Sequence, residues 1–116
     1  MANLTLDINE YDDATSNDVA NLVYNIKMYY VYFLQLINGD LYKGSTEDLK
    51  RRFVEHSKGK VTSTKNYRPI KLLGYEAYLL KSDATRREKF LKTTEGMRLL
   101  KQQYKDVINY LQKSND

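Results

Sequence analysis

Residues 29–44 read YYVYFLQLINGDLYKG, and this stretch decides the fold. Its first half is rich in aromatic and β-branched side chains, which favour a central strand. Asn38-Gly39-Asp40 then predicts a tight turn, because glycine tolerates positive φ and the flanking side chains can bond their own backbone. Leu41-Tyr42-Lys43-Gly44 returns as a second strand. We therefore expect a β-hairpin at the centre of the main domain.

A helix and a third strand are expected after the hairpin. Ser45 and Thr46 are candidate caps for a helix that runs to about His56. A basic loop follows, and Pro69 precedes a strand predicted over residues 70–79.

Helices are predicted for the rest of the chain. Asp83 is the expected cap of a helix that continues to about Lys92, and residues 94–96 form a predicted break. Apolar residues at three- and four-residue steps then predict one closing amphipathic helix: Met97, Leu100, Tyr104, Val107, Ile108 and Leu111. The order predicts an α/β (α+β) fold, a three-stranded and mainly antiparallel sheet flanked by helices.

The first 27 residues differ from the rest in charge. They hold five acidic residues and one basic residue, whereas residues 28–116 hold 18 basic and 10 acidic residues, a net charge of +8. A basic body suggests a polyanionic partner, although a solvated basic surface is equally compatible with this charge. We expect residues 1–27 to be an acidic N-terminal extension and residues 28–116 to be the main domain.

The extension itself shows two patterns. Alternating apolar residues over 4–8 allow a short strand, and helical spacing after Ser16 predicts one short helix: Val19, Leu22, Val23 and Ile26. The extension could be structural, could mask the basic surface, or could bind a protein partner.

The composition excludes several kinds of site. The chain has no cysteine, so it has no disulfide, no cysteine-ligated zinc and no thiol nucleophile. It has no long apolar run and no signal-peptide pattern, so we expect no membrane span and a location inside the cell, cytoplasmic by default.

Two predicted helices carry polar residues where packing alone would favour apolar ones. Arg52 and His56 are four residues apart beside the inward pair Leu49 and Phe53, so they project together at the rim of the core. Arg can fork onto a phosphate and His can shuttle a proton, but a surface Arg and a helix-ending His are an open alternative. Glu88 shares a helix face with Ala84 and Leu91. A carboxylate there must be paired, protonated or metal-bound, and a salt bridge to a neighbouring basic residue is the alternative.

The chain also has 11 tyrosines and no tryptophan. Tyr30 and Tyr32 share one face of the first strand, and Tyr42 lies on the second. Most tyrosines are expected to pack, but two hydroxyls near an Arg and a carboxylate could position or deprotonate a water that attacks phosphorus.

The order of these residues resembles the GIY-YIG nuclease family over roughly residues 29–96. Tyr30-Val31-Tyr32 and Tyr42-Lys43-Gly44 match the two tripeptides, and Arg52, His56 and Glu88 follow in family order. The likeness is to the compact single-domain bacterial type. The sequence departs from the family pattern at Tyr30 and Lys43, at Ser45, where several members have Lys or His, and in a late Asn without a convincing counterpart.

The resemblance implies a metal-dependent endonuclease that hydrolyses DNA by a one-metal mechanism. Glu88 would hold Mg²⁺ or Mn²⁺, Tyr32 or Tyr42 would activate the water, Arg52 would stabilise the transition state, and His56 would bond a tyrosine or the phosphate. The expected nucleic-acid contacts are Lys43, Ser45, Lys58, Lys60, Lys65 and Arg68. DNA repair is the expected setting. A nucleic-acid-binding module with this fold and weak or no cleavage is the alternative.

Overall fold

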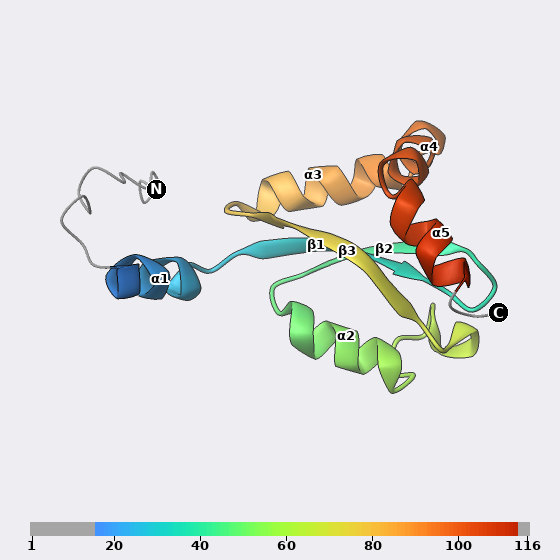
Figure 1. The fold of residues 1–116 in the computed structure, drawn as a ribbon, viewed down its shortest axis with the longest axis horizontal. Coiled ribbons are helices and arrows are strands. Elements are labelled where there is room, and N and C mark those ends of the chain that lie inside the picture. Colours follow the sequence, from blue (N-terminus) through green and yellow to red (C-terminus); the bar gives the residue numbers. More distant parts are fainter. Residues whose placement is uncertain (1–15, 114–116) are drawn as a thin grey trace.

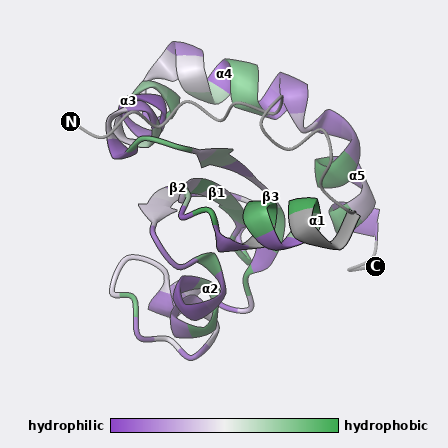
Figure 2. Ribbon diagram, turned by 90° about the vertical axis from the view of Figure 1, so that its left-hand side faces the viewer, coloured by the Kyte–Doolittle hydropathy of each residue, from purple (hydrophilic) through white to green (hydrophobic). Residues whose placement is uncertain are grey.

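The computed structural model describes residues 16–113, and within them one antiparallel sheet has the order β2-β1-β3. The strands are β1 (Tyr29–Gln35), β2 (Leu41–Thr46) and β3 (Lys71–Tyr78). Helices cover both faces (Figures 1 and 2), with α2 (Leu49–Ser57) on one side and α3 (Lys81–Leu91), α4 (Thr94–Gln103) and α5 (Lys105–Lys113) on the other. The predicted three-stranded antiparallel sheet with flanking helices is confirmed.

The central strand β1 supplies both layers of the core. Val31 and Phe33 are fully buried in a cluster with Ala84 and Leu91 of α3, so they face the α3 side. Tyr32 lies between them in sequence and is equally buried, but strand side chains alternate, so its ring faces α2. This alternation places the tyrosine on the opposite face of the sheet from the main apolar core.

The hairpin turn forms where the sequence predicts it. Gly39 has φ +91°, a conformation that glycine adopts readily. The Leu36 amide donates to the Asp40 carbonyl at 2.8 Å, and the Asp40 amide donates to the Asn38 side chain at 3.1 Å. The turn sets the register in which Tyr32 pairs with Gly44 of β2.

Helix α2 is capped by a different residue from those predicted. Asp48 is the N-cap, and its carboxylate accepts from the Arg51 amide at 3.0 Å. Thr46 instead bonds the backbone of Asp48, with its hydroxyl accepting the Asp48 amide at 3.1 Å, while Ser45 is still in β2. The prediction of Ser45 and Thr46 as caps was wrong because β2 continues through both residues before the chain turns.

The last helices also differ in their boundaries. Helix α3 begins at Lys81, so Asp83 lies in its first turn and pairs with Arg86 at 2.9 Å instead of capping it. The expected break at residues 94–96 is the first turn of α4, whose cap Thr93 accepts from the Gly96 amide at 3.1 Å. A Cβ on Gly96 would clash with the end of α3, so this glycine allows the two helices to approach closely.

The predicted single closing helix is two helices. Helix α4 ends at Gln103, and Tyr104 has a non-helical backbone with φ −105° and ψ 23° before α5 begins. The ring of Tyr104 packs on Phe33 with centroids 5.2 Å apart, and its ring also lies against Gly74 of β3. The bend at Tyr104 therefore lets both helices follow the same face of the sheet.

The acidic extension is described only in part. Helix α1 (Ser16–Asn25) confirms the predicted short helix and lies beyond the start of β1, away from the sheet layers (Figure 1). The strand predicted over residues 4–8 lies outside the described residues. Within residues 16–113, no helix combines the length and the hydropathy that a membrane crossing needs.

Candidate active site

The glycine of the second tripeptide makes room for the tyrosine of the first. Gly44 lies opposite Tyr32 in the β1–β2 register. A Cβ added at Gly44 would be 2.5 Å from the Tyr32 hydroxyl oxygen, well inside van der Waals contact. The Tyr32 ring therefore lies directly over Gly44, and its hydroxyl reaches the β2 edge of the sheet because no side chain blocks it there.

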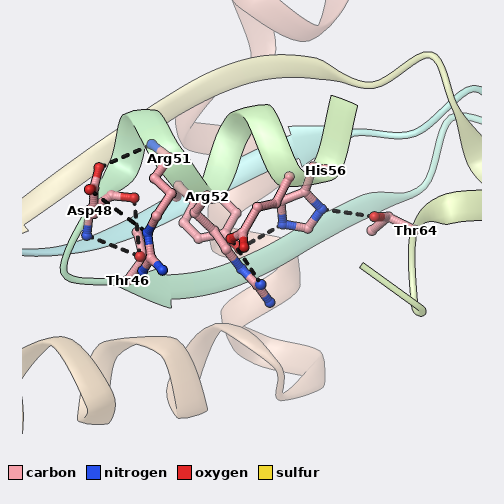
Figure 3. Close-up of polar contacts among 8 residues, drawn as sticks. Thr46, Asp48, Arg51, Arg52, His56 and Thr64 are labelled. Carbon is pink, nitrogen blue, oxygen red and sulfur yellow. Dashed lines mark hydrogen bonds and ion pairs between the residues drawn. The ribbon is translucent and has the colours of Figure 1, made fainter. Parts of the chain in front are cut away.

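His56 of α2 forms a hydrogen bond with this hydroxyl. Its Nε2 lies 2.7 Å from the Tyr32 oxygen and its Nδ1 lies 2.8 Å from Oγ1 of Thr64 (Figure 3). The side chain is fully buried, and burial together with the nearby Arg52 charge lowers the pKa of His56 to about 4. His56 is thus a neutral, doubly hydrogen-bonded residue near the end of α2, not a solvated helix-ending cation.

Tyr42 completes an aromatic group with these two residues. Its ring centroid is 5.1 Å from that of His56 and 6.2 Å from that of Tyr32. Unlike Tyr32, which is 1% exposed, Tyr42 is half-buried. Of the two predicted catalytic tyrosines, Tyr42 is therefore the one that solvent can reach.

Arg52 brings a positive charge to the same group. It projects from the same side of α2 as His56 (Figure 3) and interacts with the Tyr32 hydroxyl, which raises the pKa of Arg52 further. The guanidinium also pairs with Glu55 at 3.5 Å, and about a third of the side chain is exposed. Burial nevertheless dominates at Tyr32 and raises its pKa to about 12, so Tyr32 keeps its proton at neutral pH.

A pocket of about 380 Å³ lies between Arg52 and α3. Arg51, Arg52 and Glu55 line it from α2, and Ala84 and Thr85 line it from α3. The remaining lining residues include Ser45 and Thr46 at the end of β2. The pocket therefore spans the β2 end of the sheet and joins the two helix layers.

Glu88 belongs to the α3 side. It lies one helical turn beyond Ala84, its side chain is 19% exposed, and its carboxylate pairs with Lys92 at 3.0 Å. The structure thus brings Tyr32, Tyr42, Arg52 and His56 together, whereas the ion-pair partner of Glu88 is Lys92. Within residues 16–113, no three His, Cys, Asp or Glu residues lie close enough together to form a metal cluster.

The predicted nucleic-acid contacts fall into two groups. Lys43 and Ser45 project from β2 toward the α3 side, where Lys43 lies 3.9 Å from the Met97 sulfur, and burial lowers the pKa of Lys43. The other group follows α2 and comprises Lys58, Lys60, Lys65 and Arg68, all exposed.

Arg68 differs from the three lysines of its group. Its guanidinium donates to the backbone carbonyls of Lys65 at 3.0 Å and Ser57 at 3.3 Å, and it lies against Gly59. Those bonds hold the loop against the end of α2, so Arg68 has a structural role beside any contact with a phosphate.

Two partners of the candidate site residues were not named from the sequence, Thr64 and Lys92. Thr64 lies in the loop after α2 and is fully buried, but one threonine in a polar loop gives no signal of burial. Lys92 lies four residues after Glu88, a spacing that brings side chains together on a helix, and its ion pair confirms the alternative that Glu88 pairs with a neighbouring basic residue.

Comparisons with known proteins identify the family of the chain. A model of the GIY-YIG catalytic domain matches residues 28–104. A UPF0213 protein from Staphylococcus epidermidis is 36% identical over 74 residues, which is 63% of this chain and 90% of that protein. A second, from Streptococcus agalactiae, is 42% identical over 64 residues, covering 54% of this chain and 73% of its own length. A third, from Cupriavidus pinatubonensis, is 36% identical over 63 residues, 53% of this chain and 70% of its own.

No solved structure matches this chain significantly. The family assignment therefore rests on the sequence model and the relatives, and the sheet order and helix arrangement are consistent with it. The family model covers most of the chain, including both tripeptides, Arg52, His56 and Glu88. The chain belongs to the GIY-YIG catalytic domain family.

Proposed function

We propose that this protein is a metal-dependent endonuclease that hydrolyses DNA phosphodiester bonds. The observation that carries the proposal is the convergence of Tyr32, Tyr42, Arg52 and His56, of which Arg52 also lines a pocket shared with α3. Family membership supports a nuclease-type activity. The net charge of +8 on residues 28–116 suits a polyanionic substrate.

The two tyrosines have different roles in this proposal. Tyr42 is the half-buried one, so it is the candidate to hold or deprotonate the attacking water. Tyr32 retains its proton because burial raises its pKa to about 12. In this proposal Tyr32 therefore acts through its hydrogen bond to His56 and its interaction with Arg52, the residue that would bind the phosphate.

Arg52 is the candidate for stabilising the transition state. Part of its side chain faces the pocket, so a phosphate can reach it, and the planar guanidinium suits two phosphate oxygens at once. Its present partner Glu55 is also partly exposed, so this pair costs little to open. Arg52 would then brace the charge that develops on phosphorus oxygens.

Glu88 is the candidate ligand for Mg²⁺ or Mn²⁺. Mg²⁺ sites often use one or two carboxylates and complete their shell with water and substrate phosphate, which fits a lone partly exposed carboxylate. Lys92 presently neutralises that carboxylate and is itself more than half exposed, so it can turn away. A bound divalent cation supplies charge neutralisation at the scissile phosphate.

The exposed lysines after α2 are proposed to contact the DNA backbone. Lys58, Lys60 and Lys65 fix position on the duplex without reading sequence, and Arg68 holds their loop in place. Lys43 and Ser45 would contribute from the α3 side.

The test is cleavage of plasmid, branched and single-stranded DNA with Mg²⁺, with Mn²⁺ and with EDTA. Glu88→Gln should reduce cleavage about 1,000-fold while DNA binding is retained, because the metal ligand is lost but the cationic surface is not. Glu95→Gln is the matched control, since Glu95 is an exposed carboxylate paired with Arg98 on α4. Cleavage by Glu88→Gln at the control rate would refute the metal site.

A nucleic-acid-binding module without efficient cleavage is the second candidate. The Glu88–Lys92 ion pair favours it, because a carboxylate that stays paired cannot hold a metal. DNA binding by the wild-type protein with no cleavage of any substrate in Mg²⁺ or Mn²⁺ would select this candidate.

Residues 1–27 are proposed as a separate extension that binds a protein partner or masks the basic surface. Deleting them should raise DNA affinity at low salt if they mask, since their net charge is opposite to that of the body. Unchanged affinity would exclude masking and leave a structural role or partner binding. A location inside the cell and a role in DNA repair are also part of the proposal.

A further inference from the structure

Three buried side chains, those of Thr64, His56 and Tyr32, form a continuous line of hydrogen bonds that leads into the candidate active site. Thr64 and His56 are fully buried and Tyr32 is 1% exposed, so none of them has water as a ready partner. The two contacts along the line are 2.8 Å and 2.7 Å, both normal hydrogen-bond lengths. Each contact has one donor and one acceptor. The position of the imidazole proton therefore decides whether the hydrogen bonds run from Thr64 to Tyr32 or from Tyr32 to Thr64.

Thr64 decides that direction. Its hydroxyl is buried, and the His56 ring nitrogen is its hydrogen-bond partner in the described structure. If Nδ1 carried the imidazole proton, that proton would point at the hydroxyl oxygen and leave the hydroxyl hydrogen buried without an acceptor. Burying an unpaired donor costs on the order of 1–3 kcal/mol, whereas donation from Thr64 to Nδ1 pairs both groups of this contact.

The neutral imidazole then carries its proton on Nε2. Burial keeps His56 neutral, so with Nδ1 accepting from Thr64 the single ring proton is on Nε2 and is donated to the Tyr32 oxygen. The Tyr32 hydroxyl hydrogen must then point elsewhere. Tyr42 is the neighbour that it meets, because the two rings are 6.2 Å apart and their side chains interact.

The backbone around Thr64 holds the start of this line in place. The Thr64 amide donates to the Val61 carbonyl at 3.1 Å, and the Thr64 carbonyl accepts from the Tyr67 amide at 2.9 Å. The Tyr67 carbonyl in turn accepts from the Ile37 amide of the β-hairpin at 3.0 Å. The loop is therefore tied to the strands that carry Tyr32 and Tyr42, and the Thr64 hydroxyl cannot drift relative to His56.

We propose that Thr64 is a positioning residue, which fixes the Nε2-protonated form of His56 and so directs a chain of hydrogen bonds through Tyr32 to the Tyr42 oxygen. The inference about catalysis rests on the proposed nuclease function. In that setting the line of hydrogen bonds would orient the Tyr42 hydroxyl toward the water or phosphate, because the Tyr32 hydroxyl hydrogen would be donated to the Tyr42 oxygen.

The first test is ¹⁵N NMR of the imidazole at neutral pH. His56 is the only histidine in the chain, so its two ring nitrogens are assigned without ambiguity. We expect a protonated Nε2 and an unprotonated Nδ1 whose resonance shows a donated hydrogen bond. Thr64→Val should lose that hydrogen-bond signature at Nδ1, and Thr64→Ser should retain it. A protonated Nδ1 in the wild-type protein, or an unchanged Nδ1 resonance in Thr64→Val, would overturn the proposal.

The second test is cleavage by the same variants at equal DNA occupancy. Thr64→Val removes one buried hydrogen bond without changing side-chain volume much, so we expect cleavage about tenfold slower, with rescue in Thr64→Ser. Equal rates for both variants would refute a positioning role. The wild-type NMR measurement stands even if Thr64→Val fails to fold.

The two tests also separate this inference from the proposed function. If the wild-type protein cleaves nothing, the nuclease proposal fails, while the ring-nitrogen resonances still report whether Thr64 sets the tautomer. If cleavage is robust and the wild-type Nδ1 is protonated, the function holds and this inference fails.

Discussion

The two faces of the sheet hold the candidate catalytic residues in opposite ways. On the α2 face, Tyr32 and His56 are buried, neutral and joined by short hydrogen bonds that extend to Thr64. On the α3 face, Glu88 and Lys92 are charged, partly exposed and joined by one ion pair. The first arrangement is fixed by packing before any substrate arrives, whereas the second can exchange its partner.

This difference suggests that the two faces of the sheet have different roles at its β2 edge. Buried neutral hydrogen bonds give a defined geometry, because each donor has one acceptor and no competing water. An ion pair that is partly exposed on its lysine side contributes less stability than a buried network and can exchange its partner. The α2 face would therefore position groups, and the α3 face would accept a charged ligand.

Arg52 offers the strongest way to sharpen the comparison, since it belongs to the fixed face but reaches the pocket. Arg52→Lys keeps the charge and loses the planar fork, so we expect cleavage to fall about 100-fold with DNA binding nearly unchanged. Single-turnover cleavage with DNA affinity measured in parallel is the assay. Arg51→Lys is the matched control, because Arg51 also lines the pocket but pairs with Asp48 at the surface. Equal rates for the two variants would remove Arg52 from the reaction.

Stability against pH tests whether the α2 face is neutral. The pKa of His56 is about 4 in the folded protein, below its ordinary value of 6.5, so the unfolded state binds more protons between these values. Stability from this group is therefore complete above about pH 6.5 and is lost as pH falls toward 4. The loss should be about 2–3 kcal/mol by pH 4.

Urea unfolding at pH 7 and pH 4.5 measures this loss, with His56→Gln as the reference. Carboxylates also titrate in this range, so the informative quantity is the difference between the two proteins. The wild-type advantage in free energy of unfolding should shrink as pH falls. A difference that is independent of pH would mean that His56 is not held neutral.

Much of the α2 face could be predicted from the sequence. The hairpin, the alternation that turns Tyr32 away from Val31 and Phe33, and the four-residue step from Arg52 to His56 all follow from local rules. The burial of His56 could not be predicted, because it depends on Thr64 arriving from a loop eight residues later.

Helix boundaries failed for a related reason. Asp48 caps α2 in place of the predicted Ser45 and Thr46, and α3 begins at Lys81, two residues before the predicted cap Asp83. Tertiary packing sets these boundaries, because β2 extends to Thr46 and Gly96 lets α4 start against α3. The amphipathic pattern from Met97 to Leu111 likewise continued through the bend at Tyr104, because both helices bury the same face.

Lys92 tests the exchangeable face, with the smallest effect on stability. Lys92→Met keeps much of the aliphatic side chain and removes the charge. Because the pair is partly solvated, the free energy of unfolding should fall by less than about 1 kcal/mol. Glu88 then loses its competing cation, so Mn²⁺ should bind more tightly in calorimetric titrations. Lys89→Met is the control, being an exposed lysine on the same helix without an ion pair to Glu88 in the described structure. If Lys92→Met destabilises the fold by several kcal/mol and leaves Mn²⁺ binding unchanged, the pair is a fixed structural bridge. The contrast between the two faces of the sheet would then be lost, because the polar contacts on both faces would be fixed.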